Sequence, residues 1–212
     1  NVIGSRRFKK LVKTEQWERA SEIGRAQVKK GAQIVDVCVA DPDREELEDM
    51  EAFLTEVIKK VKAPLMIDST DAAVIERALT YCQGKAIINS VNLEDGLERF
   101  DAVVPIARKY GAALVVGCID EDPDAGMGVT RERKLAIAER SVEILTTKYG
   151  VPVEDLIFDP LVFPCATGDA AYIGSAKETV EGVRAIKEAF PEARTILGIS
   201  NVSFGLPSAG RE

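Results

Sequence analysis

The chain has 212 residues, of which 46% are hydrophobic and 30% charged, a composition typical of a soluble globular protein with one large domain. A net charge of −7 and a pI near 4.9 argue against a nucleic-acid or anionic-membrane partner. No apolar run approaches the roughly 18 residues of a membrane span, and no signal-peptide pattern is present. Histidine is absent, which excludes a histidine base, a Ser-His-Asp triad and a His-ligated metal from this chain.

The four cysteines, Cys38, Cys82, Cys118 and Cys165, lie far apart and form no C-x-x-C pair. This spacing favours free thiols in a reducing compartment over a disulfide framework or a zinc site. We therefore expect a cytoplasmic protein.

Residues 1–12 are basic and carry no strand pattern. Thr14 is predicted to cap a helix over 15–30 that Gly31 ends, and a strand follows over 33–39.

Asp43 and Glu46 resemble a capping box before a helix over 44–61. The apolar run 64–68 predicts a buried strand, after which Thr70 can cap a helix over 71–81.

The remaining pattern continues the alternation of strand and helix. Strands are predicted over 85–89, 112–119, 155–159 and 194–200, and helices over 93–109, 130–148 and 175–190, capped by Asn92, Thr130 and Ser175.

Six strand-then-helix units with short connections predict an α/β fold with a parallel sheet. A TIM (β/α)₈ barrel lacking its first and last strands fits this count, and the chain reads as one barrel domain over 1–212, a fragment of a longer multidomain protein. An open doubly-wound sheet is the rival, but the glycine-rich phosphate loop expected after its first strand is absent.

Five short apolar runs at or within the predicted strands end in Asp or Asn. The residues are Asp36, Asp68, Asn89, Asp159 and Asn201. Such residues often only cap helices or shape turns, but in a barrel the carboxyl ends of the strands converge on one site. A divalent cation held by Asp68, Asp120 and Asp159 is an alternative use of the same carboxylates.

Carboxylates only accept hydrogen bonds, whereas an Asn side chain both donates and accepts. A pocket lined by both kinds of group suits a flat heterocycle with N–H donors beside a carbonyl. The 2-amino-4-oxo ring of a pterin has this edge.

Six segments of the chain, in order, resemble the pterin-binding family. They are NVIGSRRFKK at 1–10, GAQIVD at 31–36, MIDST at 66–70, INS at 88–90, IFDP at 157–160 and GISNVSF at 198–204. The resemblance is greatest to the folate domains of cobalamin-dependent methionine synthases, then to methyltetrahydrofolate:corrinoid protein methyltransferases, with dihydropteroate synthases more distant. Relatives often carry Asn where this chain has Cys38.

The resemblance implies a barrel that binds methyltetrahydrofolate as substrate. It implies that Asp68, Asn89 and Asp159 hold the pterin edge with Asn1 and Asp36 nearby, and that Ser90, Gly198 and Ser203 are neighbours. It places Asn201 beside the methyl-bearing ring nitrogen, so Asn201 and Asp159 become the catalytic candidates, and it leaves Arg211 as a possible contact for the folate tail.

The implied reaction transfers the methyl group to a reduced corrinoid in methionine synthesis. This chain has neither a histidine for cobalt nor a cysteine cluster for zinc, so a separate cobalamin-binding domain or corrinoid protein is the expected partner. Two alternatives stay open. One is a dihydropteroate synthase-like enzyme, although the segment 200–203 lacks the lysine expected there, and the other is a non-catalytic folate-binding module.

Overall fold

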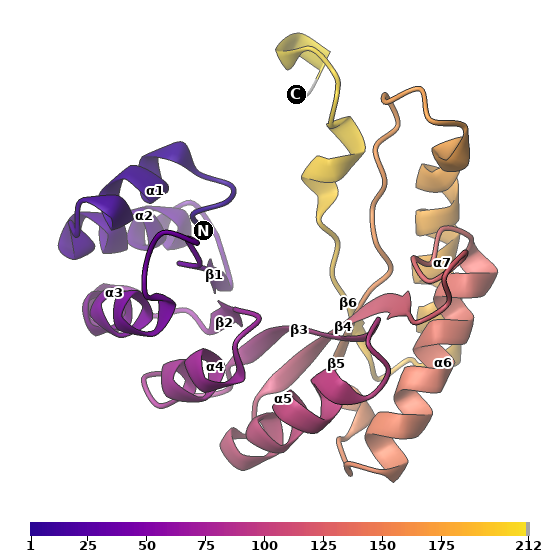
Figure 1. Ribbon diagram of the computed structural model, residues 1–212, viewed down its shortest axis with the longest axis horizontal. Helices are drawn as coiled ribbons and strands as arrows, with labels where there is room; N and C mark the ends of the chain where they lie inside the picture. The colour runs from indigo at the N-terminus through magenta and orange to yellow at the C-terminus, as the bar shows by residue number, and fades with distance from the viewer. Residues whose placement is uncertain (211–212) are drawn as a thin grey trace. The chain divides into compact units, whose positions relative to one another are not determined.

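A computed structural model describes residues 1–210. In this range the chain forms an α/β fold in which five strands are each followed by a helix (Figure 1). The strands are β1 (Val35–Val37), β2 (Leu65–Asp68), β3 (Ile87–Leu93), β4 (Ala113–Asp120), β5 (Leu156–Asp159) and β6 (Arg194–Thr195). The helices are α1 (Arg6–Lys13), α2 (Trp17–Lys29), α3 (Glu46–Lys60), α4 (Ala72–Leu79), α5 (Glu98–Tyr110), α6 (Arg131–Thr147) and α7 (Ser175–Ala189).

The order of the strands in the sheet is their order in the chain, from β1 to β6. Pairing is parallel, with Asp36 opposite Met66, Asp68 opposite Asn89 and Gly117 opposite Asp159. A doubly-wound sheet reverses its strand order part-way, so this order rules out that rival and agrees with the singly wound barrel class.

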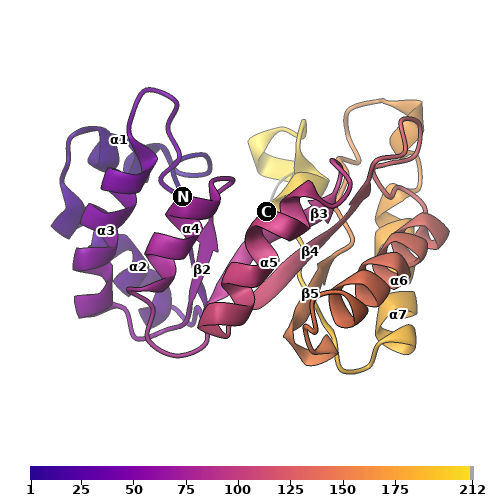
Figure 2. The same ribbon diagram turned by 60° about the horizontal axis from the view of Figure 1, so that its bottom comes forward.

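The chain divides into two compact units. Unit 1 comprises Asn1–Ser90 and Pro105–Ala113, and unit 2 comprises Val91–Val104 and the chain from Leu114 on. Figure 2 shows the helices α2, α3 and α4 of unit 1 alongside its strands, and α6 beside α7 in unit 2. No helix in residues 1–210 is long and apolar enough to cross a membrane.

The first helices of unit 1 differ from the prediction. Residues 6–13 form a helix, α1, whose N-cap Ser5 accepts a hydrogen bond from the Phe8 amide at 3.2 Å. Thr14 ends α1 instead of capping the next helix, and α2 starts at Trp17. The short strand β1 replaces the longer one predicted over 33–39.

Two other predicted caps in unit 1 are wrong. Asp43 makes no cap bond to α3, and its carboxylate pairs with Lys13 at 3.3 Å instead. Asp71 rather than Thr70 caps α4, accepting from the amides of Ala73 and Val74 at 2.7 and 3.3 Å. Asp and Thr are both common N-cap residues, so local sequence does not show which of two adjacent residues of these types caps the helix.

The strand β3 runs past Asn89 to Leu93, so Asn89 lies within a strand and not at its end. Buried Val91 and Leu93 continue the apolar pattern beyond the polar pair that suggested a stop. Asn92 also lies in β3, where its side chain accepts from the Glu94 amide at 3.0 Å and caps no helix.

In unit 2, Thr130 caps α6 as predicted. The buried face of this helix consists of Lys134, Ile137, Ala138, Ser141 and Leu145, whereas the apolar residues Leu135 and Val142 are only half-buried. The N-cap of α7 is Gly174, in the left-handed region at φ 81°, and Ser175 is the first helical residue.

The last predicted strand, over 194–200, shrinks to the two residues of β6. A 3₁₀ helix follows at Ile199–Ser203, so Asn201 lies in a tight turn and not at a strand end. Residues 160–168 and 196–204 run side by side in Figure 1, where the Cys165 amide donates to the Val202 carbonyl at 3.1 Å.

Candidate functional site

Four polar side chains of unit 1 form a cluster, which we call the Asp68 cluster: Asn1, Asp36, Asp68 and Asn89. Asn1 Nδ2 donates to Asp36 Oδ2 at 3.1 Å and approaches Asp68 Oδ2 at 3.4 Å. Asn89 Nδ2 reaches Asp36 Oδ1 at 3.5 Å. The turn that presents Asn1 is fixed because its own Oδ1 accepts from the amides of Ile3 and Gly4 at 2.9 and 3.1 Å.

The electrostatics of the Asp68 cluster are those of crowded carboxylates. Burial, reinforced by the negative charge of Asp36, raises the pKa of Asp68 to about 6. Burial likewise raises the pKa of the Cys38 thiol to about 11, so Cys38 stays protonated and supplies a weak donor to Asp68. An N–H ligand would give the ionised Asp68 carboxylate stronger hydrogen bonds than this thiol does.

The carboxylate of unit 2, Asp159, ends β5 as predicted. One of its oxygens accepts from the Leu161 amide at 2.9 Å. Burial raises the pKa of Asp159, and the Leu161 amide and the ammonium of Lys134 oppose this rise.

Asp159 lines a cavity of about 350 Å³, which we call the Asp159 cavity. Gly198 and Asn201 line it as well, so the structure brings three of the predicted residues of unit 2 together. The rest of the wall is largely apolar and aromatic, and it includes Met127, Leu161, Val162, Phe163, Pro164, Tyr172 and Phe204.

Three other predicted residues fall outside these two groups. Ser203 donates its hydroxyl to the Ser200 carbonyl at 3.2 Å and is not among the residues lining the Asp159 cavity. Ser90 follows Asn89 in β3 and is half-buried. Arg211 lies outside the described residues.

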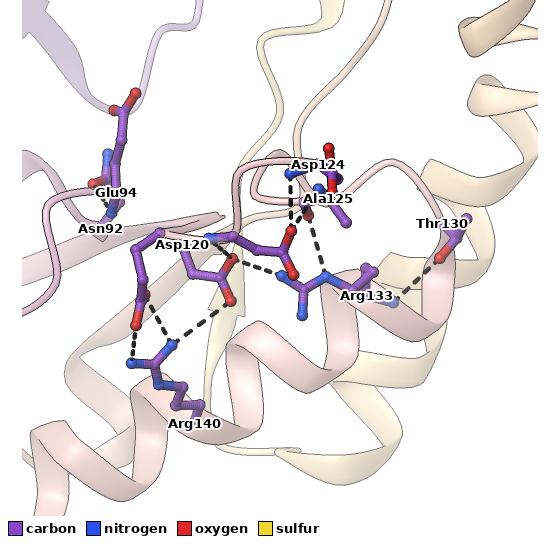
Figure 3. Close-up of polar contacts among 10 residues, drawn as sticks. Asn92, Glu94, Asp120, Asp124, Ala125, Thr130, Arg133 and Arg140 are labelled. Carbon is purple, nitrogen blue, oxygen red and sulfur yellow. Dashed lines mark hydrogen bonds and ion pairs between the residues drawn. The ribbon is translucent and has the colours of Figure 1, made fainter.

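Asp120, at the end of β4, was one candidate ligand of the alternative cation site. Figure 3 shows it turned toward two arginines of α6. Arg133 Nη2 lies 2.6 Å from Asp120 Oδ1, and Arg140 Nη1 lies 3.7 Å from Oδ2. Across residues 1–210, no group of three acidic or cysteine side chains is placed to hold a metal. The arginines already neutralise this carboxylate.

Residues 1–211 match the family described as pterin binding enzyme. The chain belongs to this pterin-binding family. Among curated relatives of the pterin-binding chain, the methionine synthases of Mycobacterium tuberculosis and Mycobacterium leprae are 35% and 34% identical to it over 215 residues. These alignments cover 100% of this chain but 18% of each relative, so it corresponds to a small part of those proteins.

Solved structures similar to the pterin-binding chain include two dihydropteroate synthases. The enzyme from Xanthomonas albilineans with 4-aminobenzoic acid has a TM-score of 0.61 and 17% identity, covering 89% of this chain and 66% of that one. The enzyme from Thermus thermophilus has a TM-score of 0.56 and 24% identity, covering 86% and 67%. These identities establish the fold alone, and they confirm the predicted TIM-barrel class.

The sequence analysis did not identify Lys134, whose ammonium donates a hydrogen bond to the carbonyl of Pro160 in the loop after Asp159. The signal was present in the helix pattern, since Lys134 precedes Ile137 and Ala138 by three and four residues and therefore shares their buried face. Lysine is almost never fully buried, so residue type alone assigns this position to the surface.

Proposed function

We propose that this domain binds methyltetrahydrofolate and presents its methyl group for transfer to a reduced corrinoid held by another domain or protein, as a step of methionine synthesis. The observation that carries the proposal is the Asp68 cluster, a set of two carboxylates and two amides on the pterin-binding family's fold. The methionine synthase relatives, which match the whole chain, favour this reaction within the family.

In this proposal Asp68 accepts hydrogen bonds from the 2-amino group and ring N–H of the pterin. Its raised pKa supports this role, because an ionised carboxylate that is short of donors gains most from two N–H groups. Asn89 meets the opposite, carbonyl-bearing edge of the ring, since an amide can donate there. Asn1 and Asp36 hold Asn89 and Asp68 in place.

We assign the catalytic roles to Asp159 and Asn201. A tertiary amine is a poor leaving group, so its nitrogen must gain a proton or a strong hydrogen bond as the bond to the methyl carbon breaks. The reduced corrinoid supplies the cobalt nucleophile that accepts the methyl group. Without histidine in the chain, the Asn201 amide and the Asp159 carboxyl, with a water, are the groups that could strengthen this hydrogen bond in the transition state.

The dihydropteroate synthase-like reaction is the second enzyme candidate, and the solved neighbours favour it only at the level of fold. A folate-binding module without catalysis is the third. All three predict pterin binding, so they differ only in the fate of the bound pterin.

The test is to titrate methyltetrahydrofolate into the full chain by calorimetry and then add cob(I)alamin, following its absorbance. We expect saturable binding, loss of the cob(I)alamin spectrum on methylation, and no binding by Asp68→Ala. Binding without methylation would favour the non-catalytic module, and no binding at all would reject the proposal. Formation of dihydropteroate from a pterin pyrophosphate and 4-aminobenzoate would favour the second enzyme.

A further inference from the structure

Lys134 of α6 is a charged side chain with an exposed fraction of 0%. Its Nζ donates to the Gly128 carbonyl at 2.7 Å and to the Pro160 carbonyl, and it lies 5.1 Å from the centre of the Phe163 ring. A buried ammonium is normally expensive unless an ion pair meets it. Here two carbonyl dipoles and an aromatic face do so.

These partners come from the loops that follow β4 and β5. Gly128 precedes α6, whereas Pro160 directly follows Asp159 and Phe163 lines the Asp159 cavity. The Phe163 ring in turn stacks on Tyr172, with ring centres 4.9 Å apart and planes at 16°. A single ammonium therefore holds both the backbone beside Asp159 and one aromatic wall of the Asp159 cavity.

Neighbouring residues of unit 2 are built around this contact. A Cβ at Gly182 of α7 would lie 2.5 Å from Lys134 Cδ, so only glycine leaves room for the lysine. Thr179 of α7 donates to the Leu161 carbonyl at 2.9 Å, which ties the same loop from its other side. Leu161, whose carbonyl accepts from Thr179 and which follows the Pro160 carbonyl bound by Lys134, has φ 64°. Non-glycine residues rarely adopt this conformation, so surrounding contacts must stabilise it.

We propose that Lys134 is a positioning residue of the pterin site, which fixes the loop 160–163 so that the Asp159 carboxylate and the Phe163 ring face the ligand. The identity of the ligand in this inference rests on the proposed function, whereas the contacts between Lys134 and the loop do not depend on it. It explains why a lysine occupies a core position that a leucine or methionine would fill at lower desolvation cost.

The proposal has a pH signature. Burial lowers the pKa of Lys134 to about 8, and the charged or ionisable groups that face it, Cys118 of β4, Asp159 of β5 and Glu178 of α7, oppose the shift. Above pH 8 the amine becomes neutral and its bonds to the two carbonyls weaken. Methyltetrahydrofolate affinity of the unmodified protein should therefore fall between about pH 7.5 and 9.

The experiment compares Lys134→Met, which keeps the length of the side chain and removes its donors, with Lys187→Met. Lys187 is a matched control because its Nζ also donates to two carbonyls, of Pro191 at 2.7 Å and Ala193 at 2.5 Å, and it lines no part of the Asp159 cavity. Gly182→Ala gives a second variant, which displaces the lysine without altering it. The measurements are amide exchange in the peptide 160–164 and calorimetric affinity for methyltetrahydrofolate.

In Lys134→Met and Gly182→Ala we expect exchange in this peptide to rise by at least about tenfold and affinity to fall by at least about tenfold. Lys187→Met should stay within about twofold, and the affinity of Lys134→Met should no longer change between about pH 7.5 and 9. Unchanged exchange in the peptide 160–164 of both Lys134→Met and Gly182→Ala would overturn the inference, as would unchanged affinity. If the unmodified protein binds no methyltetrahydrofolate, the proposed function fails, and the exchange result still decides whether Lys134 holds the loop.

Discussion

Asn89 of β3 donates to Asp36 of β1 at 3.5 Å, although β2 lies between these strands in the sheet. The contact spans the carboxyl end of β2, where Asp68 emerges. Asp36 thus accepts from the amides of both Asn89 and Asn1, while Asp68 receives a long contact of 3.4 Å from the Asn1 amide and a weak hydrogen bond from the Cys38 thiol. Asp36 is the carboxylate better supplied with amide donors, and Asp68 is the group left to meet a ligand.

Replacing Asp68 by Asn should stabilise the free protein and abolish its pterin affinity. The pKa of Asp68 is raised from 3.8 to about 6 in the folded state, so between these values the folded protein holds a proton that the unfolded chain releases. Ionisation therefore removes stability as the pH rises through this window, and Asp68→Asn should gain about 1 to 3 kcal/mol at about pH 7 and nothing at about pH 3.5.

Urea unfolding at the two pH values measures this difference. Asp43→Asn, which removes an exposed carboxylate paired with Lys13, serves as the control and should show no such gain. By the same reasoning, methyltetrahydrofolate should bind the unmodified protein more weakly below pH 6, where Asp68 becomes protonated. Normal folate binding by Asp68→Asn at neutral pH would mean that the pterin lies elsewhere.

Asn201→Ala should slow methyl transfer more than it weakens binding. The proposed contact of the Asn201 amide strengthens only as the nitrogen loses its methyl group, so the rate should fall by about 10²-fold while the dissociation constant changes by less than about fivefold. Single-turnover methylation of cob(I)alamin gives the rate and calorimetry gives the affinity. Ser200→Ala, an exposed side chain in the same 3₁₀ helix, is the control. Equal losses in rate and affinity would instead make Asn201 a simple binding residue.

Asp120→Ala should destabilise the fold by about 3 kcal/mol, because it leaves the partly buried Arg133 guanidinium without its carboxylate. Glu121→Ala removes the neighbouring acid, which pairs with Arg140 at the surface, and should have a much smaller effect. Thermal unfolding of both variants gives the comparison. Adding Mg²⁺ or Ca²⁺ to the unmodified protein should leave its unfolding temperature unchanged. A marked rise that Asp120→Ala abolishes would support the alternative cation site.

The helix caps give a further test. Asp71→Ala should lower the free energy of unfolding by about 1 kcal/mol, because the amides of Ala73 and Val74 lose their acceptor at the start of α4. Thr70→Ala should have a smaller effect, since Thr70 is not the cap that its sequence suggests. Chemical denaturation measures the free energy of unfolding of both variants. A larger loss in Thr70→Ala than in Asp71→Ala would mean that Thr70 is the N-cap.

The sequence predicted best those elements that are bounded by strong local signals. Pro64 and Asp68 bracket one apolar run, and Asp155 and Asp159 bracket another, and β2 and β5 follow these limits closely. The end of the chain was harder. The strand β6 comprises only Arg194 and Thr195, which pair with Ile157 and Phe158, and after the Ile196 amide donates to the Phe158 carbonyl at 2.8 Å the chain turns into the 3₁₀ helix at Ile199–Ser203.

The candidate site shows the same division. The positions of Asp36, Asp68 and Asn89 in successive predicted strands indicated that these side chains lie close together, because parallel strands carry their carboxyl ends to the same edge of a sheet. Asn1, the fourth member of the Asp68 cluster, was indicated by the family resemblance alone. The position of Asn201 in a 3₁₀ turn, and of Lys134 against the Phe163 ring, depends on contacts between segments that local periodicity does not encode. Arg211 remains a prediction from resemblance.

The strand order β1 to β6 also bears on how the chain is made. Each new strand pairs with the one synthesised just before it, so a growing chain can add hydrogen-bonded layers as it leaves the ribosome, without waiting for distant sequence. With this topology, assembly of the sheet can keep pace with translation.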